Sequence, residues 1–203
     1  MFDARIRVVV GPPLEAAGRR LAFMGLSPTV ITAVGWGAGV GACVAAALQL
    51  WPLALVLWLT NRAFDGLDGP VARAKGATER GAFLDVVADF SVYGGFVVGV
   101  AIGVPDARLA CAVLLFTYYV SGTALLALSS LLERRRQNNV DERSLRLVGG
   151  FAEGFETVVA YVLFCLFPGS AAGIAWVFSA LVGLTAVQRV VAGARMLTIT
   201  RAS

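Results

Sequence analysis

The sequence predicts an all-α, polytopic membrane protein, and three observations lead to that class. Of its 203 residues, 58% are hydrophobic and only 15% are charged. The mean hydropathy is +0.78, whereas a soluble domain of this size exposes far more charge. Apolar stretches of about 20 residues, the length that crosses a bilayer core, recur along the chain between short polar or Pro/Gly turns.

Six apolar stretches predict six transmembrane helices, at residues 27–50, 52–73, 82–104, 107–132, 147–167 and 171–191. Ser27 and Pro28 supply an N-cap and a first-turn proline for the first of them. We expect a single membrane domain over residues 1–203, with the six-helix bundle at 27–194. Residues 1–25 mix arginines with apolar side chains, which predicts an amphipathic segment in the membrane interface, interrupted at Pro12-Pro13.

The distribution of basic residues predicts the orientation in the membrane. With the N-terminus inside, the cytoplasmic set is Arg5, Arg7, Arg19, Arg20, Arg73, Lys75, Arg80, Arg134, Arg135, Arg136, Arg143, Arg146, Arg195 and Arg201. Only Arg108 is clearly outside, and this bias places both termini in the cytoplasm. Because the arginines flank apolar spans, the net charge of +4 indicates lipid headgroups as partners and not nucleic acid. A chain rich in arginine with one lysine is typical of a high-GC bacterium, so we expect the bacterial inner membrane.

Four aspartates lie where the second and third spans face each other across a short loop, namely Asp65, Asp68, Asp85 and Asp89. Their spacings, i to i+3 and i to i+4, place each pair on one helical face. Carboxylates at membrane depth cost about 2.5–3.5 kcal/mol each, and like charges repel unless a cation lies between them. The sequence therefore predicts a metal centre here. The alternative is that single aspartates pair with Arg62, Arg73 or Arg80.

The chain has no histidine, which excludes histidine metal sites and nucleophiles activated by histidine. A metal in this protein must be bound by oxygen atoms, and that ligand type is preferred by hard divalent cations such as Mg²⁺, Mn²⁺ and Ca²⁺.

The segment 65–89 resembles the signature of the CDP-alcohol phosphotransferases, which reads D-x-x-D-G-x-x-A-R, a gap, and G-x-x-x-D-x-x-x-D. Besides the four aspartates, the matching positions are Gly69, Ala72, Arg73 and Gly81. The predicted six spans and the amphipathic N-terminal segment resemble the family too. The gap between Arg73 and Gly81 holds seven residues, where eight is usual, so we expect a small shift of the loop.

The resemblance implies an enzyme that transfers a substituted phosphoryl group from a CDP-linked donor to an alcohol and releases CMP, using two divalent ions, Mg²⁺ or Mn²⁺. It implies that all four aspartates bind metal and that Asp89, together with Asp85, is catalytic, with Asp89 as the general base. Gly69, Ala72, Arg73 and Gly81 would contact the nucleotide and pyrophosphate, and Thr29 and Thr32 occupy the remaining nucleotide-binding region.

The donor and the acceptor stay open. The leading prediction is CDP-diacylglycerol with a small polar acceptor; the alternative is a CDP-amino-alcohol donor with a diacylglycerol acceptor. Candidate acceptor-binding residues at the cytoplasmic ends of the later spans are Arg134, Arg143, Arg146, Arg189, Glu153 and Glu156. Arg189 is the strongest of them because an unpaired guanidinium within a span is costly.

Two further interpretations belong to other classes of protein. A small cation or proton transporter would spread its carboxylates through the bilayer, whereas these cluster at one hairpin. A catalytically inactive homologue would lack a carboxylate of the motif, and none is missing. Glycines at four-residue steps, in 35–41 and 95–103, allow close helix approach; they predict a homodimer interface or packing within the bundle.

Overall fold

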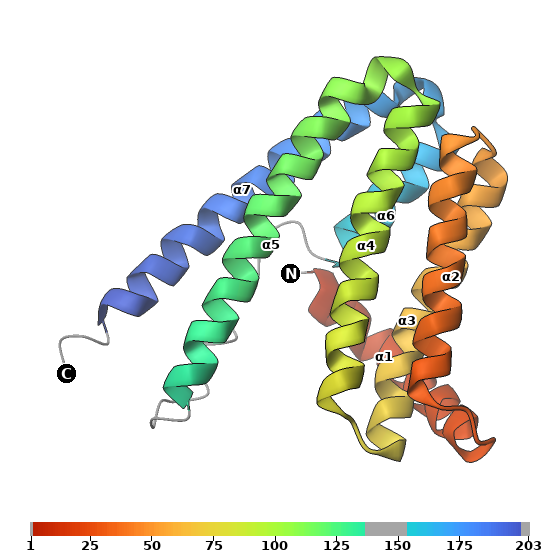
Figure 1. The fold of residues 1–203 in the computed structure, drawn as a ribbon, viewed down its shortest axis with the longest axis vertical. Coiled ribbons are helices and arrows are strands. Elements are labelled where there is room, and N and C mark those ends of the chain that lie inside the picture. Colours follow the sequence, from red (N-terminus) through yellow and green to blue (C-terminus); the bar gives the residue numbers. More distant parts are fainter. Residues whose placement is uncertain (1, 137–153, 200–203) are drawn as a thin grey trace.

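The computed structural model describes residues 2–136 and 154–199, and within those ranges it consists of helices without strands (Figure 1). The elements are α1 (Phe2–Phe23), α2 (Pro28–Ala47), α3 (Trp51–Lys75), α4 (Glu79–Gly103), the 3₁₀ turn η1 (Pro105–Ala107), α5 (Arg108–Arg136), α6 (Gly154–Leu166), the 3₁₀ turn η3 (Pro168–Ser170) and α7 (Ala171–Ile199). The predicted all-α fold is confirmed for this part of the chain.

Four of the described helical segments are long and apolar enough to cross a membrane: Pro28–Ala47, Glu79–Gly103, Pro105–Glu133 and Pro168–Leu197. The protein is therefore an integral membrane protein. Helix α3 is 25 residues long but carries arginines and aspartates in its second half, and the described part of α6 has 13 residues. The structure thus supports the membrane class, with four candidate spans among the described helices.

Local sequence signals explain where the helices around the site begin and end. Ser27 caps α2 as predicted, and its side chain accepts a hydrogen bond from the Val30 amide at 3.3 Å. Thr78 caps α4 in the same way. Helix α3 ends at Gly76, whose φ of 95° favours glycine. The predicted interruption of the first segment at Pro12-Pro13 is wrong: α1 continues through both prolines, because the fixed φ of proline is compatible with a helix even though its missing N–H loses a hydrogen bond.

Helices α2, α3 and α4 pack side by side, whereas α5 and α7 form a long pair that diverges from them (Figure 1). Glycines bring α2 and α4 together. A Cβ on Gly99 would lie 2.3 Å from the Cys43 carbonyl oxygen, and one on Gly103 would lie 2.5 Å from that of Ala46. These glycines pack within the bundle, while a Cβ on Gly37 would meet nothing within 4 Å.

An aromatic cluster joins α3, α4 and α6 next to the acidic hairpin. Trp58, Phe96, Tyr161 and Phe164 are fully buried. The Tyr161 ring centroid lies 4.7 Å from those of Trp58 and Phe96, and the Tyr161 hydroxyl donates a 2.7 Å hydrogen bond to the Tyr93 carbonyl oxygen. Buried rings of this size contribute much of the packing energy, so this cluster holds α3, α4 and α6 together next to the polar site.

Candidate functional site

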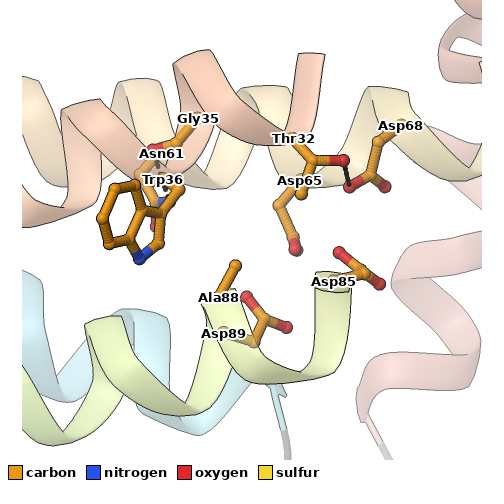
Figure 2. Close-up of a pocket in the computed structure, with 9 residues that line it drawn as sticks. All are labelled: Thr32, Gly35, Trp36, Asn61, Asp65, Asp68, Asp85, Ala88 and Asp89. Carbon is orange, nitrogen blue, oxygen red and sulfur yellow. Dashed lines mark hydrogen bonds between the residues drawn. The ribbon is translucent and has the colours of Figure 1, made fainter. Parts of the chain in front are cut away.

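The hairpin formed by α3 and α4 brings the four predicted aspartates to one pocket. Asp65 and Asp68 extend from α3, and Asp85 and Asp89 extend from α4 (Figure 2). Only residues 76–78 separate the two helices. The seven residues between Arg73 and Gly81 are thus the end of α3, this link and the start of α4. The full pocket lining is Thr32, Gly35, Trp36, Asn61, Asp65, Asp68, Asp85, Ala88 and Asp89.

Three of the carboxylates form a cluster suited to a cation. Asp65, Asp68 and Asp85 each offer an oxygen atom, and these atoms lie within 4.8 Å of one another. Among the described residues, no arginine or lysine forms an ion pair with Asp68 or Asp85. The Thr32 hydroxyl lies 3.3 Å from Asp68 Oδ2, to which it can donate. Oxygen ligands held this close with so little positive charge fit a hard divalent cation.

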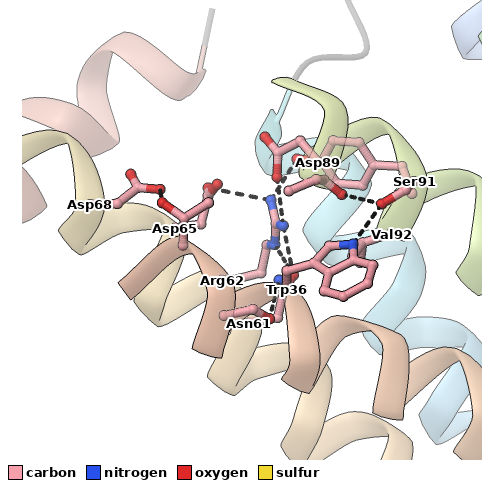
Figure 3. A network of polar contacts seen from close by, with 12 residues as sticks. Trp36, Asn61, Arg62, Asp65, Asp68, Asp89, Ser91 and Val92 are labelled. Atoms are coloured by element: carbon pink, nitrogen blue, oxygen red, sulfur yellow. Dashed lines mark hydrogen bonds and ion pairs between the residues drawn. The ribbon is translucent and has the colours of Figure 1, made fainter. Parts of the chain in front are cut away.

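Asp89 is not a member of that cluster, and it forms an ion pair with an arginine. Arg62 Nη2 donates to Asp89 Oδ1 at 2.9 Å, and Arg62 Nη1 donates to Asp65 Oδ2 at 3.3 Å (Figure 3). The ion pair with Arg62 that the sequence left open is thus present for these two aspartates, and their role as metal ligands stays a prediction. Asp65 takes part in both groups of residues: it is a member of the cluster with Asp68 and Asp85, and it also forms an ion pair with Arg62.

The predicted nucleotide-binding residues take different positions. Thr32 lines the pocket, whereas Thr29 is exposed on the first turn of α2 and is not among the lining residues. Arg73 forms an ion pair with Glu15 of α1. A Cβ on Gly69 would lie 3.3 Å from Arg73 Nη1, so glycine leaves room for that guanidinium.

Two more positions of the motif lie beside the hairpin link. The Gly81 amide donates a 3.1 Å hydrogen bond to Thr78 Oγ1, which makes Gly81 part of the cap of α4. Ala72 is half-buried on α3. Neither of them lines the pocket.

The predicted acceptor-binding residues lie elsewhere. Arg189 on α7 donates a 2.8 Å hydrogen bond from Nη1 to Ser121 Oγ on α5. Glu156 is half-buried in the first turn of α6. Arg143, Arg146, Glu153 and the side chain of Arg134 lie outside the described residues. Of the described members of this set, neither Arg189 nor Glu156 is among the residues that line the acidic pocket.

Sequence reasoning missed several residues that complete the site. The Trp36 Nε1 donates a 2.9 Å hydrogen bond to Ser91 Oγ and so links α2 to α4 at the pocket. Asn61 and Tyr93 both bind Arg62. The adjacent polar residues Asn61 and Arg62 within an apolar span were a usable signal, since such residues are costly in a membrane unless they serve a purpose. Trp36 and Tyr93 gave no signal of that kind.

Four carboxylates gathered at one hairpin of a helical membrane protein suit a metal centre of the kind that acts on phosphate esters. Residues 26–188 match the family model described as CDP-alcohol phosphatidyltransferase, and the chain belongs to this family. It is accordingly an enzyme of phospholipid biosynthesis, as the sequence predicted, and the transporter and inactive-homologue interpretations are set aside.

Relatives extend this similarity over most of the chain. The Escherichia coli (strain K12) protein named "Inner membrane protein YnjF" is 37% identical, and the match covers 95% of each chain. The archaetidylinositol phosphate synthase of Pyrococcus horikoshii is 34% identical over 101 residues, covering 49% of this chain and 54% of that one.

The fold is that of a solved synthase. The crystal structure of Mycobacterium tuberculosis phosphatidylinositol phosphate synthase with CDP-DAG bound has a TM-score of 0.71 at 22% identity, covering 89% of this chain and 92% of that one. The same synthase was also solved in complex with manganese and citrate. The family uses divalent metals, so the predicted kind of cofactor is confirmed at the level of the family.

Proposed function

We propose that this protein transfers a phosphatidyl group from CDP-diacylglycerol to the hydroxyl group of a small polar alcohol and releases CMP, with two divalent ions, Mg²⁺ or Mn²⁺. The observation that carries the proposal is the cluster of Asp65, Asp68 and Asp85 beside Asp89 in one pocket. The similar synthase solved with CDP-DAG supports this type of donor.

In this proposal Asp65, Asp68 and Asp85 are the main metal ligands, and Asp89 completes the second site. Divalent cations, when bound, neutralise the donor pyrophosphate and stabilise charge on the leaving oxygen. Thr32 holds Asp68 in place through its hydroxyl group. Arg73 binds the pyrophosphate after exchanging its ion pair with Glu15 for the substrate, and Gly69 gives it space to do so.

The nucleotide needs space as well as charge. In the proposal, Ala72 keeps α3 narrow where the cytidine lies, Gly81 keeps the start of α4 narrow, and Thr29 adds a hydroxyl at the start of α2. Ala72 and Gly81 lie on α3 and α4, the helices that carry the aspartates, and Thr29 lies in the first turn of α2.

Asp89 acts as the general base. The acceptor oxygen forms a bond to the β-phosphorus of the donor, the bond from that phosphorus to the oxygen of CMP breaks, and the hydroxyl proton passes to the Asp89 carboxylate. Arg62 orients this carboxylate through its 2.9 Å contact. Asp85 lies one helical turn away on α4, so one face of that helix serves both the metal and the proton.

The acceptor belongs to the same proposal. A phosphate-bearing alcohol requires a cationic pocket, to which Arg189 would contribute, together with Arg134, Arg143 and Arg146. Glu153 and Glu156 would bind hydroxyl groups or an amine. The name of the Pyrococcus relative puts inositol phosphate first among the acceptors to test. A CDP-amino-alcohol donor with a diacylglycerol acceptor is the alternative.

The proposed setting is the bacterial inner membrane, which the name of the E. coli relative supports. Helices α3 and α6 would join the four candidate spans to make six within a single domain, and α1 would lie in the interface. Both termini and the acidic pocket would face the cytoplasm, following the distribution of arginine. The homodimer predicted from glycine steps is part of this proposal, with Gly37 as a step that the bundle leaves open.

The test is CMP release by the purified protein from CDP-diacylglycerol with Mg²⁺ or Mn²⁺, across inositol phosphate, inositol, glycerol 3-phosphate, serine and ethanolamine. We expect release that depends on one acceptor and disappears with EDTA. Release with CDP-ethanolamine and diacylglycerol alone would establish the alternative donor. Folded protein that binds neither metal nor CDP would contradict the proposal.

A further inference from the structure

The inference concerns Arg62, whose guanidinium is fully engaged at one side of the acidic pocket. Its five N–H groups have acceptors: Nε and Nη2 donate to Asn61 Oδ1 at 2.9 and 2.6 Å, Nη2 also donates to Asp89, and Nη1 donates to Asp65 and to the Tyr93 hydroxyl at 2.7 Å. The side chain is 11% exposed. A guanidinium with all donors satisfied in one geometry is held in place and is not a mobile surface charge.

The surroundings fix this geometry from the protein side. Asn61 is buried, and its Nδ2 donates to the Gly35 carbonyl oxygen at 2.8 Å, which leaves Oδ1 to accept from Arg62. The guanidinium carbon lies 4.7 Å from the Trp58 ring centroid and 4.8 Å from that of Tyr93, within the range of a cation–π contact. Both rings belong to the packed aromatic cluster.

The charge in the pocket is divided unevenly as a result. Asp68 and Asp85 have no basic partner among the described residues, whereas Arg62 contacts Asp65 and Asp89. Carboxylates that bind metal are deprotonated, so in the metal-bound state the four aspartates and the guanidinium of Arg62 together carry three negative formal charges. One divalent ion at Asp65, Asp68 and Asp85 reduces this to one negative charge, and a second would make the pocket positive beside Arg62. The donor pyrophosphate brings two negative charges, which offset this excess positive charge and allow the second ion to bind.

We infer that the permanent positive charge of Arg62 makes binding of the second divalent ion depend on the donor. Without substrate, the protein binds one ion at the cluster of Asp65, Asp68 and Asp85. The second ion binds together with the CDP-linked substrate. This inference rests on the proposed function, because it presupposes the metal centre. Its consequence is an ordered assembly, in which the metal pair is complete only when the pyrophosphate is in place.

The first measurement is the Mn²⁺ stoichiometry of the full-length wild-type protein in detergent, read from electron paramagnetic resonance, without and with CDP-glycerol. CDP-glycerol is water-soluble and carries the same doubly charged pyrophosphate diester as the lipid donor. We expect one Mn²⁺ without it and two with it, the pair showing the spin coupling of ions about 3.5–4 Å apart. Titration of CDP-glycerol without protein corrects for Mn²⁺ bound by the nucleotide.

The second measurement repeats the titration on Arg62→Gln, which removes the charge and keeps polar atoms near Asn61. We expect its second Mn²⁺ to bind without nucleotide, at least about tenfold more tightly than in the wild type. Arg62→Lys keeps the charge and should retain the dependence on nucleotide. The matched control is Arg108→Gln at the start of α5, where Arg108 Nε donates to the carbonyl oxygen of Ala101 in the last turn of α4; it should behave as the wild type.

Each outcome decides a different statement. Two Mn²⁺ in the wild type without nucleotide, or one in both states, would overturn the inference and leave the proposed metal centre standing. No Mn²⁺ in either state would overturn the proposed function itself. Unchanged affinity in a folded Arg62→Gln protein would remove Arg62 from the inference, and the wild-type stoichiometry tests it even where that variant fails to fold.

Discussion

The acidic pocket and the α5–α7 pair hold their polar residues in opposite ways. In the pocket, carboxylates crowd together, and Asp68 and Asp85 have no basic partner among the described residues. Between α5 and α7, the guanidinium of Arg189 donates to the hydroxyl group of the buried Ser121. The first region gathers negative charge, and the second holds a positive charge that is bonded within the helix pair. Under the proposed function, the donor would bind at the first region and the acceptor at the second.

The largest effect expected from this comparison is the loss of the metal centre. Asp85→Asn keeps the shape of the side chain and removes a charged ligand, so we expect CMP release to fall at least about a hundredfold. Mn²⁺ affinity should fall with it, as measured by the same titration. Asp106→Asn in η1, at the other end of α4, is the matched control and should leave both unchanged.

A near wild-type rate of CMP release by Asp85→Asn would contradict the proposed metal centre in the acidic pocket. The three-carboxylate cluster would then be a structural feature of the hairpin, and the metal would have to bind elsewhere. Weakened Mn²⁺ binding with an intact rate would instead separate the metal from the chemistry.

How far the sequence predicted the site depends on how local the information is. Asp65, Asp68, Asp85 and Asp89 lie within one helical hairpin, and their spacing alone predicted a common face. The cap by Ser27 and the helix ends were local for the same reason. The helix through Pro12-Pro13 was mispredicted because the sequence rule weighs the lost hydrogen bond more than the compatible φ.

What the sequence could not predict is set by contacts between distant segments. The sequence predicted Arg62 as a possible partner of the aspartates, yet its contact with Asp89 depends on the hydrogen bond from Asn61 to Gly35 and on Tyr93. These contacts join α2, α3 and α4 at separations that no pattern of period 3.6 encodes. The assignment of Asp89 to the metal remains a prediction, since the structure pairs it with Arg62.

The second prediction concerns the α5–α7 side and is smaller. Arg189→Gln should raise the acceptor KM about tenfold and leave the KM for CDP-diacylglycerol unchanged, because the charge would bind the acceptor and not the donor. Steady-state kinetics with each substrate varied in turn measure both constants. Ser121→Ala, which removes the partner hydroxyl and keeps the charge, should have a weaker effect on the same constant.

Other effects of Arg189→Gln on the two KM values would change which substrate is assigned to the α5–α7 side. If Arg189→Gln lowered thermal stability but left the acceptor KM unchanged, the arginine would serve to join α5 to α7, and the acceptor would bind elsewhere. If the donor KM rose as well, the two substrates would share this side of the molecule.

The smallest effect is expected at the edge of the acidic pocket. Thr32→Val keeps the branched shape and removes the hydroxyl that lies 3.3 Å from Asp68 and 3.1 Å from the Pro28 carbonyl oxygen. A single hydrogen bond contributes about 0.5–1.5 kcal/mol. Mn²⁺ affinity should therefore fall only about two- to tenfold. Thr117→Val on α5, whose hydroxyl donates to the Leu114 carbonyl oxygen at 2.8 Å, is the control. Equal losses of Mn²⁺ affinity in both variants would mean that Thr32 stabilises its helix and not the Asp68 carboxylate. Thr32 would then have no part in metal binding.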